Sequence, residues 1–317
     1  GGRWNDPRII PYTDLVLDPA AMVLHYGQAI FEGMKAYHGT GGGLYLFRPR
    51  ANMDRMNNSA RKLCMPVFDP DLVMEGLEKL VTIDRDWIPR ARGTSLYIRP
   101  TMIADEPALG VRPAASYIFY IIVGPVAAYY PEGFNPVKIY VSDEHVRSVK
   151  GGVGDAKVSG NYAASLFAAE KAKKAGYTQV LWLDAAERKY VEEVGTMNIF
   201  FLFGDELVTP PLKGTILPGV TRDSVITLAR DMGVRMVERD VAISEVIESA
   251  RSGRLKEMFG TGTAAVISPV GEIFYKGVTD KVAGGAVGPL SVKLFNHILS
   301  MQYGETPDPH GWVEKIA

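Results

Sequence analysis

Apolar residues recur at helical spacing in several stretches of the chain. In residues 51–63, Met53, Met56, Ala60 and Leu63 lie three or four positions apart, which predicts an amphipathic helix. The same pattern, with glycine stops or polar first turns, predicts further helices over residues 70–83, 162–175, 221–233, 244–251 and 289–303.

Alternating apolar and polar residues predict a strand over residues 94–103. Leu96 and Ile98 point to one face, whereas Tyr97 and Arg99 point to the other, so a phenol and a guanidinium lie side by side. An exposed sheet face with a solvated arginine is the alternative interpretation. Short apolar runs predict further strands over residues 44–47, 117–123, 137–142, 179–184, 198–203, 257–259 and 266–275.

Strands and helices mix in both halves of the chain, which indicates two α/β or α+β domains rather than one doubly wound sheet. We expect a small N-terminal α/β domain over residues 1–125 and a larger C-terminal domain over 137–317. Residues 126–136 are rich in Gly, Pro and aromatic residues, so they are the expected linker.

Composition excludes several classes of function. The formal net charge of −1 gives no global field that favours nucleic acid or an anionic membrane. The longest apolar run, residues 117–130, is interrupted by Gly124 and Pro125 and is too short to span a bilayer, so it predicts a buried strand. Cys64 is the only cysteine, which fits a reducing, cytoplasmic compartment, and the five scattered histidines lack the H-E-x-x-H spacing of a metal hydrolase.

Lys157 has an unusual local setting. It lies in G-G-V-G-D-A-K-V-S-G-N-Y, residues 151–162, directly before a predicted helix. The chain contains no Gly-Lys pair, which excludes a P-loop. Two interpretations remain, an ordinary loop lysine or an amine that forms a Schiff base, most commonly with pyridoxal phosphate.

The chain also offers candidates for the other contacts that pyridoxal phosphate needs. The helix start in P-G-V-T-R-D-S, at Val220 and Thr221, and the glycine turn G-T-G-T-A-A, residues 260–265, can each bind an anion. Arg55 can add a charge-assisted hydrogen bond to a phosphate, and Glu193 can pair with a pyridine nitrogen. Each feature also has an ordinary interpretation. The helix start can be a simple helix cap, Arg55 can be a solvated arginine, and Glu193 can be a polar residue that ends a strand.

Seven motifs in order make the chain resemble the branched-chain amino acid aminotransferases, which are class IV pyridoxal-phosphate enzymes. They are H-Y-G-Q-A-I-F-E-G-M-K-A, N-M-D-R-M, L-Y-I-R-P, G-D-A-K-V-S-G-N-Y, E-V-G-T-M-N-I-F-F, L-P-G-V-T-R and G-T-G-T-A-A. The resemblance implies the α/β fold of fold type IV enzymes, of the α+β two-domain type, with a small N-terminal α/β domain. The larger C-terminal domain is then a mixed sheet or barrel with helices that binds pyridoxal 5'-phosphate.

The resemblance also implies residue roles, with Lys157 as the Schiff-base lysine. The implied cofactor contacts are Arg55, Lys157, Tyr162, Glu193, Thr196, Gly219, Val220, Thr221 and Thr263. Among them, Tyr162 would face O3' and Glu193 the pyridine nitrogen. The implied substrate contacts are Tyr26, Phe31, Tyr97, Arg99, Val111, Tyr129, Thr263 and Ala264. Arg99 resembles the residue that receives the distal carboxylate of glutamate, and Val111 one that reaches across a dimer interface. No metal site is expected.

The implied reaction exchanges an amino group between L-leucine, L-isoleucine or L-valine and 2-oxoglutarate, giving branched 2-oxo acids and L-glutamate. A homodimer or higher homo-oligomer is implied, with no nucleic-acid or membrane partner. A D-amino acid aminotransferase or an aminodeoxychorismate lyase shares the lysine and stays an alternative, although Y-I-R-P and the run around Phe31 favour the branched-chain interpretation. A non-catalytic protein that binds a phosphorylated metabolite is the alternative of a different class.

Overall fold

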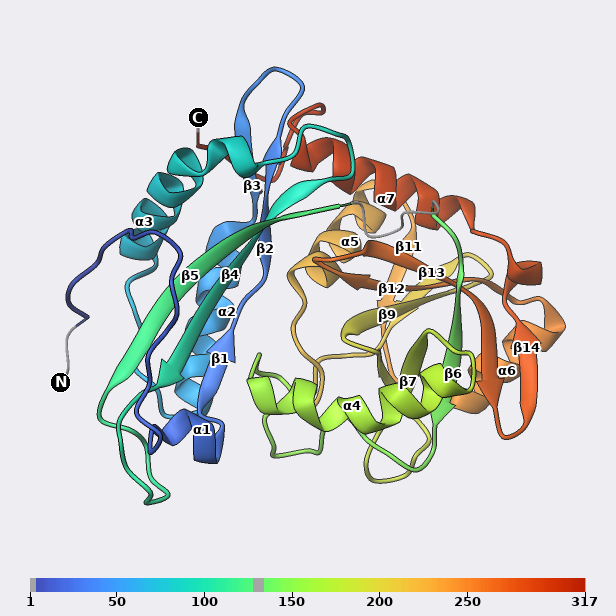
Figure 1. The fold of residues 1–317 in the computed structure, drawn as a ribbon. Coiled ribbons are helices and arrows are strands. Elements are labelled where there is room, and N and C mark those ends of the chain that lie inside the picture. Colours follow the sequence, from blue (N-terminus) through green and yellow to red (C-terminus); the bar gives the residue numbers. More distant parts are fainter. Residues whose placement is uncertain (1–3, 128–133, 317) are drawn as a thin grey trace. The chain divides into compact units, whose positions relative to one another are not determined.

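The computed structural model describes residues 4–127 and 134–316, which fall into two compact units (Figure 1). Unit 1 comprises Gly1–Ala128, Ala156–Gly160 and Ser300–Ala317, and unit 2 comprises Tyr129–Asp155 and Asn161–Leu299. The predicted domain boundaries, with a linker over 126–136, stay a prediction because residues 128–133 lie outside the described ranges.

Unit 1 is built on an antiparallel sheet with the order β1-β4-β2-β3-β15, and β5 pairs with β4. β1 pairs with the C-terminal half of β4 and β2 with its N-terminal half, so Glu32 and Gly33 lie at the break between β1 and β2. The strands are β1 (Ala29–Phe31), β2 (Met34–His38), β3 (Leu44–Phe47), β4 (Ser95–Ala104), β5 (Tyr117–Val126) and β15 (Val313–Lys315).

The helices of unit 1 are α1 (Met22–Tyr26), α2 (Pro49–Lys62), α3 (Pro70–Ile83) and the short 3-10 turn η1 (Arg85–Trp87). The predicted periodicity of α2 is confirmed, because Met53, Met56 and Ala60 are fully buried. At the start of α3, the Asp69 side chain accepts a hydrogen bond from the Asp71 amide, as an N-cap residue does.

Unit 2 contains a larger mixed sheet with the order β11-β10-β9-β12-β13-β6-β7-β8. β8 also pairs with β9, so the strands from β9 to β8 form a closed ring, as in a barrel, and β14 pairs with β13. The strands are β6 (Val137–Ser142), β7 (Gln179–Leu183), β8 (Val191–Val194), β9 (Met197–Phe203), β10 (Glu206–Thr209), β11 (Arg235–Glu238), β12 (Leu255–Gly262), β13 (Val266–Tyr275) and β14 (Val278–Lys281).

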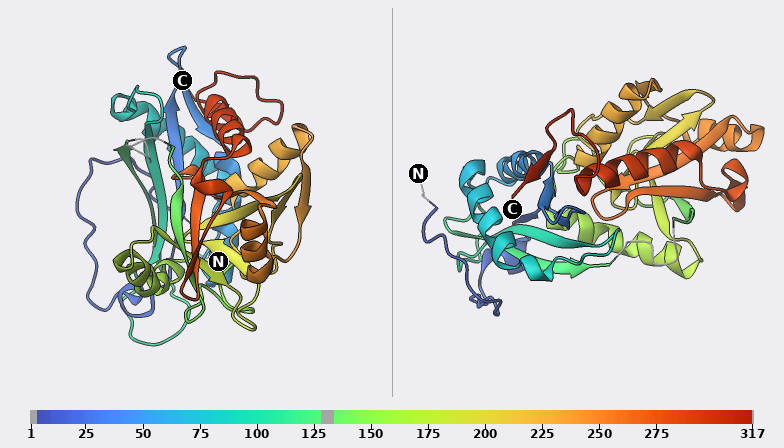
Figure 2. Two further views of the ribbon diagram at one scale, coloured as in Figure 1. Left: turned by 90° about the vertical axis from the view of Figure 1, so that its right-hand side faces the viewer. Right: turned by 90° about the horizontal axis from the view of Figure 1, so that it is seen from above.

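Helices lie around the strands of unit 2 (Figures 1 and 2). They are α4 (Ser159–Lys174), α5 (Val220–Asp231), α6 (Ile243–Ser252), α7 (Pro289–Gln302) and the 3-10 turn η2 (Ala283–Gly285). Val246 and Ile247 of α6 join Leu181, Ile199 and Phe201 of the strands in one hydrophobic cluster. This core fixes the strand ends from which the candidate site residues project.

The structure differs from the sequence prediction at several elements, and three of the differences bear on the site or on the expected linker. β8, which contains Glu193, was not predicted as a strand, and all four of its residues are buried. β5 continues through Gly124 and Pro125 and is only partly buried, because β4 is its only strand partner in the described chain and an edge strand tolerates proline. β12 extends to Gly262, so the glycine turn is shorter than predicted.

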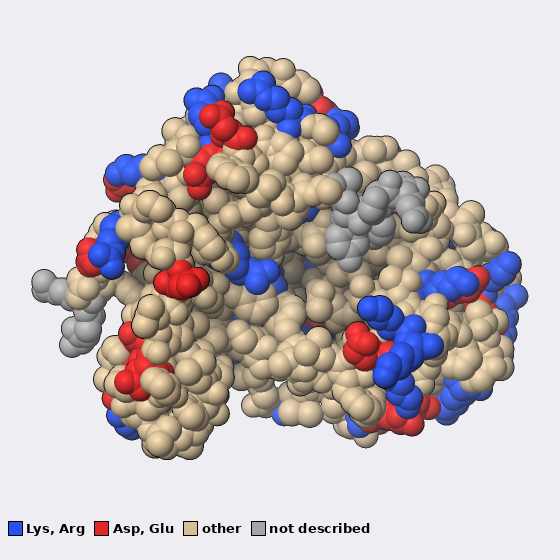
Figure 3. Space-filling view, in the orientation of Figure 1, with Lys and Arg blue, Asp and Glu red and all other residues tan. Residues whose placement is uncertain are grey.

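Basic and acidic side chains are interspersed on the face drawn in Figure 3, in line with the net charge of −1. Within the described ranges, no helix has both the length and the apolar character needed to cross a membrane. The same residues contain no group of three or more His, Cys, Asp and Glu arranged to hold a metal ion.

A buried carboxylate on β12 stabilises the start of α7. Glu257 accepts hydrogen bonds from the Leu290 amide at 2.8 Å, the Ser291 amide at 2.8 Å and the Ser291 hydroxyl at 2.6 Å.

Glu257→Gln replaces an acceptor oxygen by an amide donor, so we expect a loss of about 1–3 kcal/mol in the free energy of unfolding. Urea denaturation measures it, with the exposed Glu187→Gln as the control; equal midpoints for the two variants would contradict this role.

Candidate active site

The segment that carries Lys157 belongs to unit 1, where hydrogen bonds of the Lys157 backbone hold it. The Lys157 amide donates to the Ser59 hydroxyl at 2.9 Å, and the Phe31 amide donates to the Lys157 carbonyl at 3.2 Å. Val158 forms an isolated bridge with Ile30 of β1. Lys157 is therefore held against β1 and α2, and its amine lies 4.9 Å from the centre of the Phe31 ring.

The Lys157 amine has an unusual charge environment. Burial lowers its pKa to about 8, because the charged form loses solvation. The Glu32 carboxylate opposes this effect and raises the pKa, while the Arg55 guanidinium lowers it. Near neutral pH the lysine thus carries a larger neutral fraction than a free lysine does, which suits a nucleophile or a general base.

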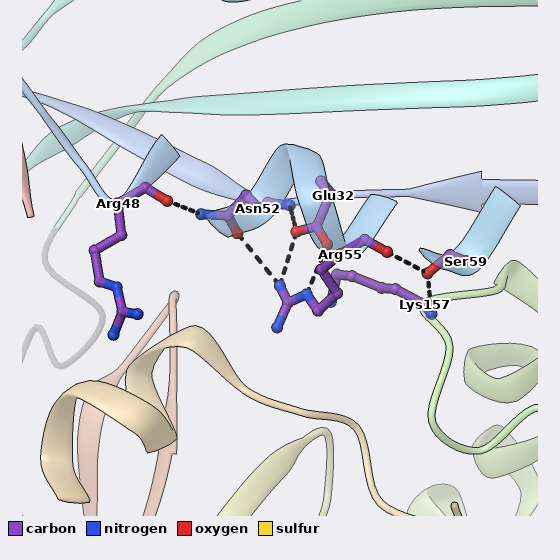
Figure 4. A network of polar contacts seen from close by, with 7 residues as sticks. Glu32, Arg48, Asn52, Arg55, Ser59 and Lys157 are labelled. Carbon is purple, nitrogen blue, oxygen red and sulfur yellow. Dashed lines mark hydrogen bonds and ion pairs between the residues drawn. The ribbon is translucent and has the colours of Figure 1, made fainter. Parts of the chain in front are cut away.

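A network of polar side chains surrounds Lys157 in unit 1 (Figure 4). Arg55 donates from Nε and Nη2 to the two carboxylate oxygens of Glu32, at 2.7 and 2.8 Å, and from Nη2 to the Asn52 oxygen at 3.3 Å. Ser59 donates to the Arg55 carbonyl at 3.0 Å. Asn52, Arg55 and Ser59 share one face of α2, because they are three and four residues apart.

The polar face of β4 forms as the alternation predicted. Arg99 donates from Nη2 to the Tyr97 hydroxyl at 2.8 Å, and its guanidinium lies 4.7 Å from the centre of the Phe31 ring. Gly33 makes room for this pair, because a Cβ there would lie 2.2 Å from the Tyr97 hydroxyl oxygen. Phe31, Tyr97 and Arg99 therefore lie together, next to Lys157.

Lys35 is a further cation on this sheet that the sequence analysis missed. It pairs directly with Tyr97 in the register of β2 and β4. Burial lowers the pKa of Lys35 to about 8. Only its place two residues after Gly33 in the E-G-M-K run could have drawn attention to it.

Two other predicted substrate residues, Tyr26 and Val111, show no contact with this group in the described part of the chain. The Tyr26 hydroxyl donates to the Leu109 carbonyl, and Val111 is 85% exposed. Tyr129 lies outside the described residues. The roles of these three residues stay predictions.

A cavity in unit 2 brings together three of the predicted cofactor contacts. Tyr162 from α4, Glu193 from β8 and Thr196 line it, together with Arg147 and Leu217. Tyr162 lies in the first turn of α4, and Glu193 and Thr196 flank the tight turn at Gly195, where φ is +56°. The turn thus sets Glu193 and Thr196 at one end of the cavity.

Glu193 is buried and held by two neighbours. The Asn198 amide donates to Glu193 Oε1 at 3.0 Å and to the Leu217 carbonyl at 2.9 Å, and Arg147 forms an ion pair with Glu193. Asn198 therefore connects Glu193 to the segment that begins α5. Gly219 is required there, because a Cβ would lie 2.0 Å from the Asn198 side-chain oxygen.

Arg147 connects the segments of this cavity, and the sequence analysis missed it. Besides the ion pair with Glu193, its Nη2 donates to the carbonyls of Gly154 at 2.7 Å and Thr215 at 2.9 Å. Gly154 precedes Lys157 in the glycine-rich segment, and Thr215 precedes the L-P-G-V-T run. No local pattern marks Arg147, because two of its partners, Glu193 and Thr215, are distant in sequence.

Two segments of unit 2 can bind an anion. α5 begins at Val220 after Gly219, so Val220 and Thr221 lie at a helix N-terminus, where backbone N–H groups and the helix dipole favour a phosphate. Thr263 and Ala264 lie in the turn between β12 and β13, whose strands pair at Gly262 and Val266. The structure confirms a turn there, and the roles of its residues stay predictions.

The lowered pKa of Lys157 predicts a titration that can be measured on the protein without cofactor. Acetylation by acetic anhydride requires the neutral amine, so its rate at Lys157 should rise with pH to a midpoint near 8, below the value of about 10.4 for free lysine. Peptide mass spectrometry follows each lysine separately, and the exposed Lys150 corrects for reagent loss. A midpoint at the free-lysine value would contradict the burial of this amine.

Comparisons with known proteins agree with the resemblance drawn from the motifs. The family model "Amino-transferase class IV" matches residues 29–273. Branched-chain-amino-acid aminotransferase 2 of Bacillus subtilis is 54% identical over 314 residues, which cover 99% of this chain and 86% of that protein.

Two solved structures of branched-chain amino acid aminotransferases are also similar. The enzyme from Escherichia coli has a TM-score of 0.78 and 28% identity, and the match covers 95% of this chain and 94% of that one. The holo-form of the enzyme from Thermobaculum terrenum, with pyridoxal phosphate, has a TM-score of 0.83 and 25% identity, with 98% and 96% covered. The predicted fold type IV architecture is confirmed, and the chain belongs to the class IV aminotransferase family.

Proposed function

We propose that this chain is a branched-chain amino acid aminotransferase. It transfers the amino group reversibly between L-leucine, L-isoleucine or L-valine and 2-oxoglutarate, giving branched 2-oxo acids and L-glutamate. The observation that carries the proposal is the buried Lys157 amine, with its pKa lowered to about 8, beside Arg55 and the Phe31–Tyr97–Arg99 group. The predicted enzyme class, a pyridoxal-phosphate-dependent aminotransferase, is confirmed by the family match and the 54% identical relative.

The residues of the chain fit pyridoxal 5'-phosphate. Lys157 supplies an amine, Arg55 and the N-terminus of α5 suit the phosphate, and Glu193 supplies a buried carboxylate. Gly219, which precedes α5, has no space for a side chain, because a Cβ there would meet the Asn198 side chain. When bound, this cofactor supplies an electron sink for negative charge at the substrate Cα.

Each side chain then has a distinct role in the proposal. Lys157 would hold the cofactor through its amine, and the neutral amine, freed when the substrate amino group takes its place, would accept the proton from the substrate Cα. Glu193 would place its negative charge near the pyridine nitrogen, and Asn198 and Arg147 keep its carboxylate in place. The phosphate is assigned to Arg55, Gly219, Val220, Thr221 and Thr263, the O3' oxygen to Tyr162, and a position near the cofactor to Thr196.

The Phe31–Tyr97–Arg99 group can serve both types of substrate. Phe31 offers an apolar ring to a branched side chain, and the Arg99 guanidinium stacked on that ring offers a charge to a distal carboxylate. One methylene changes binding in an apolar pocket by only about 1–3 kcal/mol, so several branched amino acids should share it. Tyr26, Val111 and Tyr129 are proposed to complete the apolar walls, and Thr263 and Ala264 to bind the α-carboxylate.

Assembly and location are further parts of the proposal. A homodimer is supported by the exposure of Leu109 and Val111, which are apolar and 66% and 85% exposed in the single chain. A cytoplasmic location is supported by Cys64, the single cysteine of the sequence, which leaves no disulfide within the chain.

The proposed function is tested by the visible absorption spectrum of the purified protein with its cofactor. Addition of L-leucine should bleach the band of the lysine-bound cofactor, and 2-oxoglutarate should restore it. D-alanine should leave the band unchanged. Bleaching by D-alanine and not by L-leucine would favour the D-amino acid aminotransferase, and a protein that never gains a band with added pyridoxal phosphate would contradict the enzyme.

Arg99 should separate the two substrate types. Arg99→Ala removes a charge-assisted hydrogen bond worth roughly 1.5–3 kcal/mol, so kcat/KM for 2-oxoglutarate should fall about 10- to 100-fold. The value for L-leucine should change much less. Steady-state kinetics with the exposed Arg90→Ala as a control measures both effects, and equal losses for the two substrates would refute the assignment.

A further inference from the structure

We propose that Glu32 is a positioning residue that orients the Arg55 guanidinium and keeps a negative charge beside the Lys157 amine. This inference rests on the proposed function, since it concerns the lysine and the arginine assigned there to the cofactor. Glu32 has no exposed surface and lies at the break between β1 and β2, where its amide donates to the Pro100 carbonyl at 2.8 Å.

The contact between Glu32 and Arg55 fixes the plane of the guanidinium. Two parallel hydrogen bonds, at 2.7 and 2.8 Å, join Nε and Nη2 to the two carboxylate oxygens, and the Gly33 amide donates to Glu32 Oε2 at 3.2 Å. Such a bidentate pair adds geometric specificity to its energy. In Figure 4 the terminal guanidinium nitrogen of Arg55 that does not contact Glu32 points away from that carboxylate.

This arrangement prepares Arg55 for an anion before the anion binds. An arginine that is ordered only on binding loses side-chain entropy at that moment. Here Glu32 and Asn52 already hold the side chain, which α2 carries against the sheet. The side-chain entropy of Arg55 is therefore lost on folding and not on binding. It does not reduce the affinity for a phosphate group.

Glu32 also balances the charges around Lys157. The groups that act on this amine are Glu32, Arg55, Tyr97 and Arg99; of these, the two arginines lower its pKa and Glu32 is the carboxylate that raises it. Removing the charge of Glu32 should therefore lower the pKa of Lys157 further. A purely structural Glu32 would have no such effect on the titration of the lysine.

The test compares Glu32→Gln, which keeps the shape and removes the charge, with Glu32→Asp, which keeps the charge. Glu257→Gln is the matched control, because it alters a buried carboxylate in unit 2 that also stabilises the fold. The first measurement is the dissociation constant of pyridoxal 5'-phosphate by absorption titration of the cofactor-free chain. The second is the pH midpoint of acetylation at Lys157.

We expect Glu32→Gln to weaken cofactor binding at least about 10-fold, the size of one lost charge-assisted hydrogen bond, and to move the Lys157 midpoint to lower pH. Glu32→Asp should keep the midpoint near that of the wild type, and Glu257→Gln should change neither quantity. Wild-type affinity and midpoint in Glu32→Gln would overturn the proposal. If Glu32→Gln does not fold, the test rests on the acetylation midpoint of Lys157 in Glu32→Asp. A midpoint at lower pH than in the wild type would overturn the proposal, and a wild-type midpoint would support it. A wild-type chain that binds no cofactor would instead refute the proposed function.

Discussion

The burial of one lysine amine is the constraint on which the candidate site depends. Lys157 is held by its backbone, through the Ser59 hydroxyl and the Phe31 amide, so the start of its side chain is fixed beside β1 and α2. Burial disfavours the charged amine, and the carboxylate of Glu32 limits the effect. The result is a lysine whose pKa of about 8 lies in the range useful for bond formation and proton transfer near neutral pH.

The same principle, a buried charge held by several partners, recurs in unit 2. In the sequence Glu193 is one of two adjacent carboxylates. In the structure Asn198 and Arg147 fix it and connect it to the segments at Leu217, Thr215 and Gly154. A buried charge is costly unless it is paired and hydrogen-bonded. The pairing and the hydrogen bond therefore offset the cost of burying the Glu193 carboxylate on β8, whose residues are all buried.

Sequence patterns predicted well what depends on neighbouring residues. The periodicity of α2, the alternation of β4 and the glycine turn before β13 rest on local spacing, and the structure contains all three. β8 was missed because V-E-E-V lacks alternation when both of its faces are buried. Glu32 and Arg147 were missed for another reason: their partners lie far along the chain, as Arg55 lies 23 residues from Glu32, and only the folded chain brings them together.

The most direct test of the central role of Lys157 is to locate the covalent bond to the cofactor. Borohydride reduction of the protein with pyridoxal 5'-phosphate, followed by proteolysis and mass spectrometry, identifies the modified lysine. The account predicts a phosphopyridoxyl adduct on the peptide that contains Lys157 and none on Lys35, the other lysine whose pKa is lowered to about 8. An adduct on Lys35, or no adduct on Lys157, would contradict it.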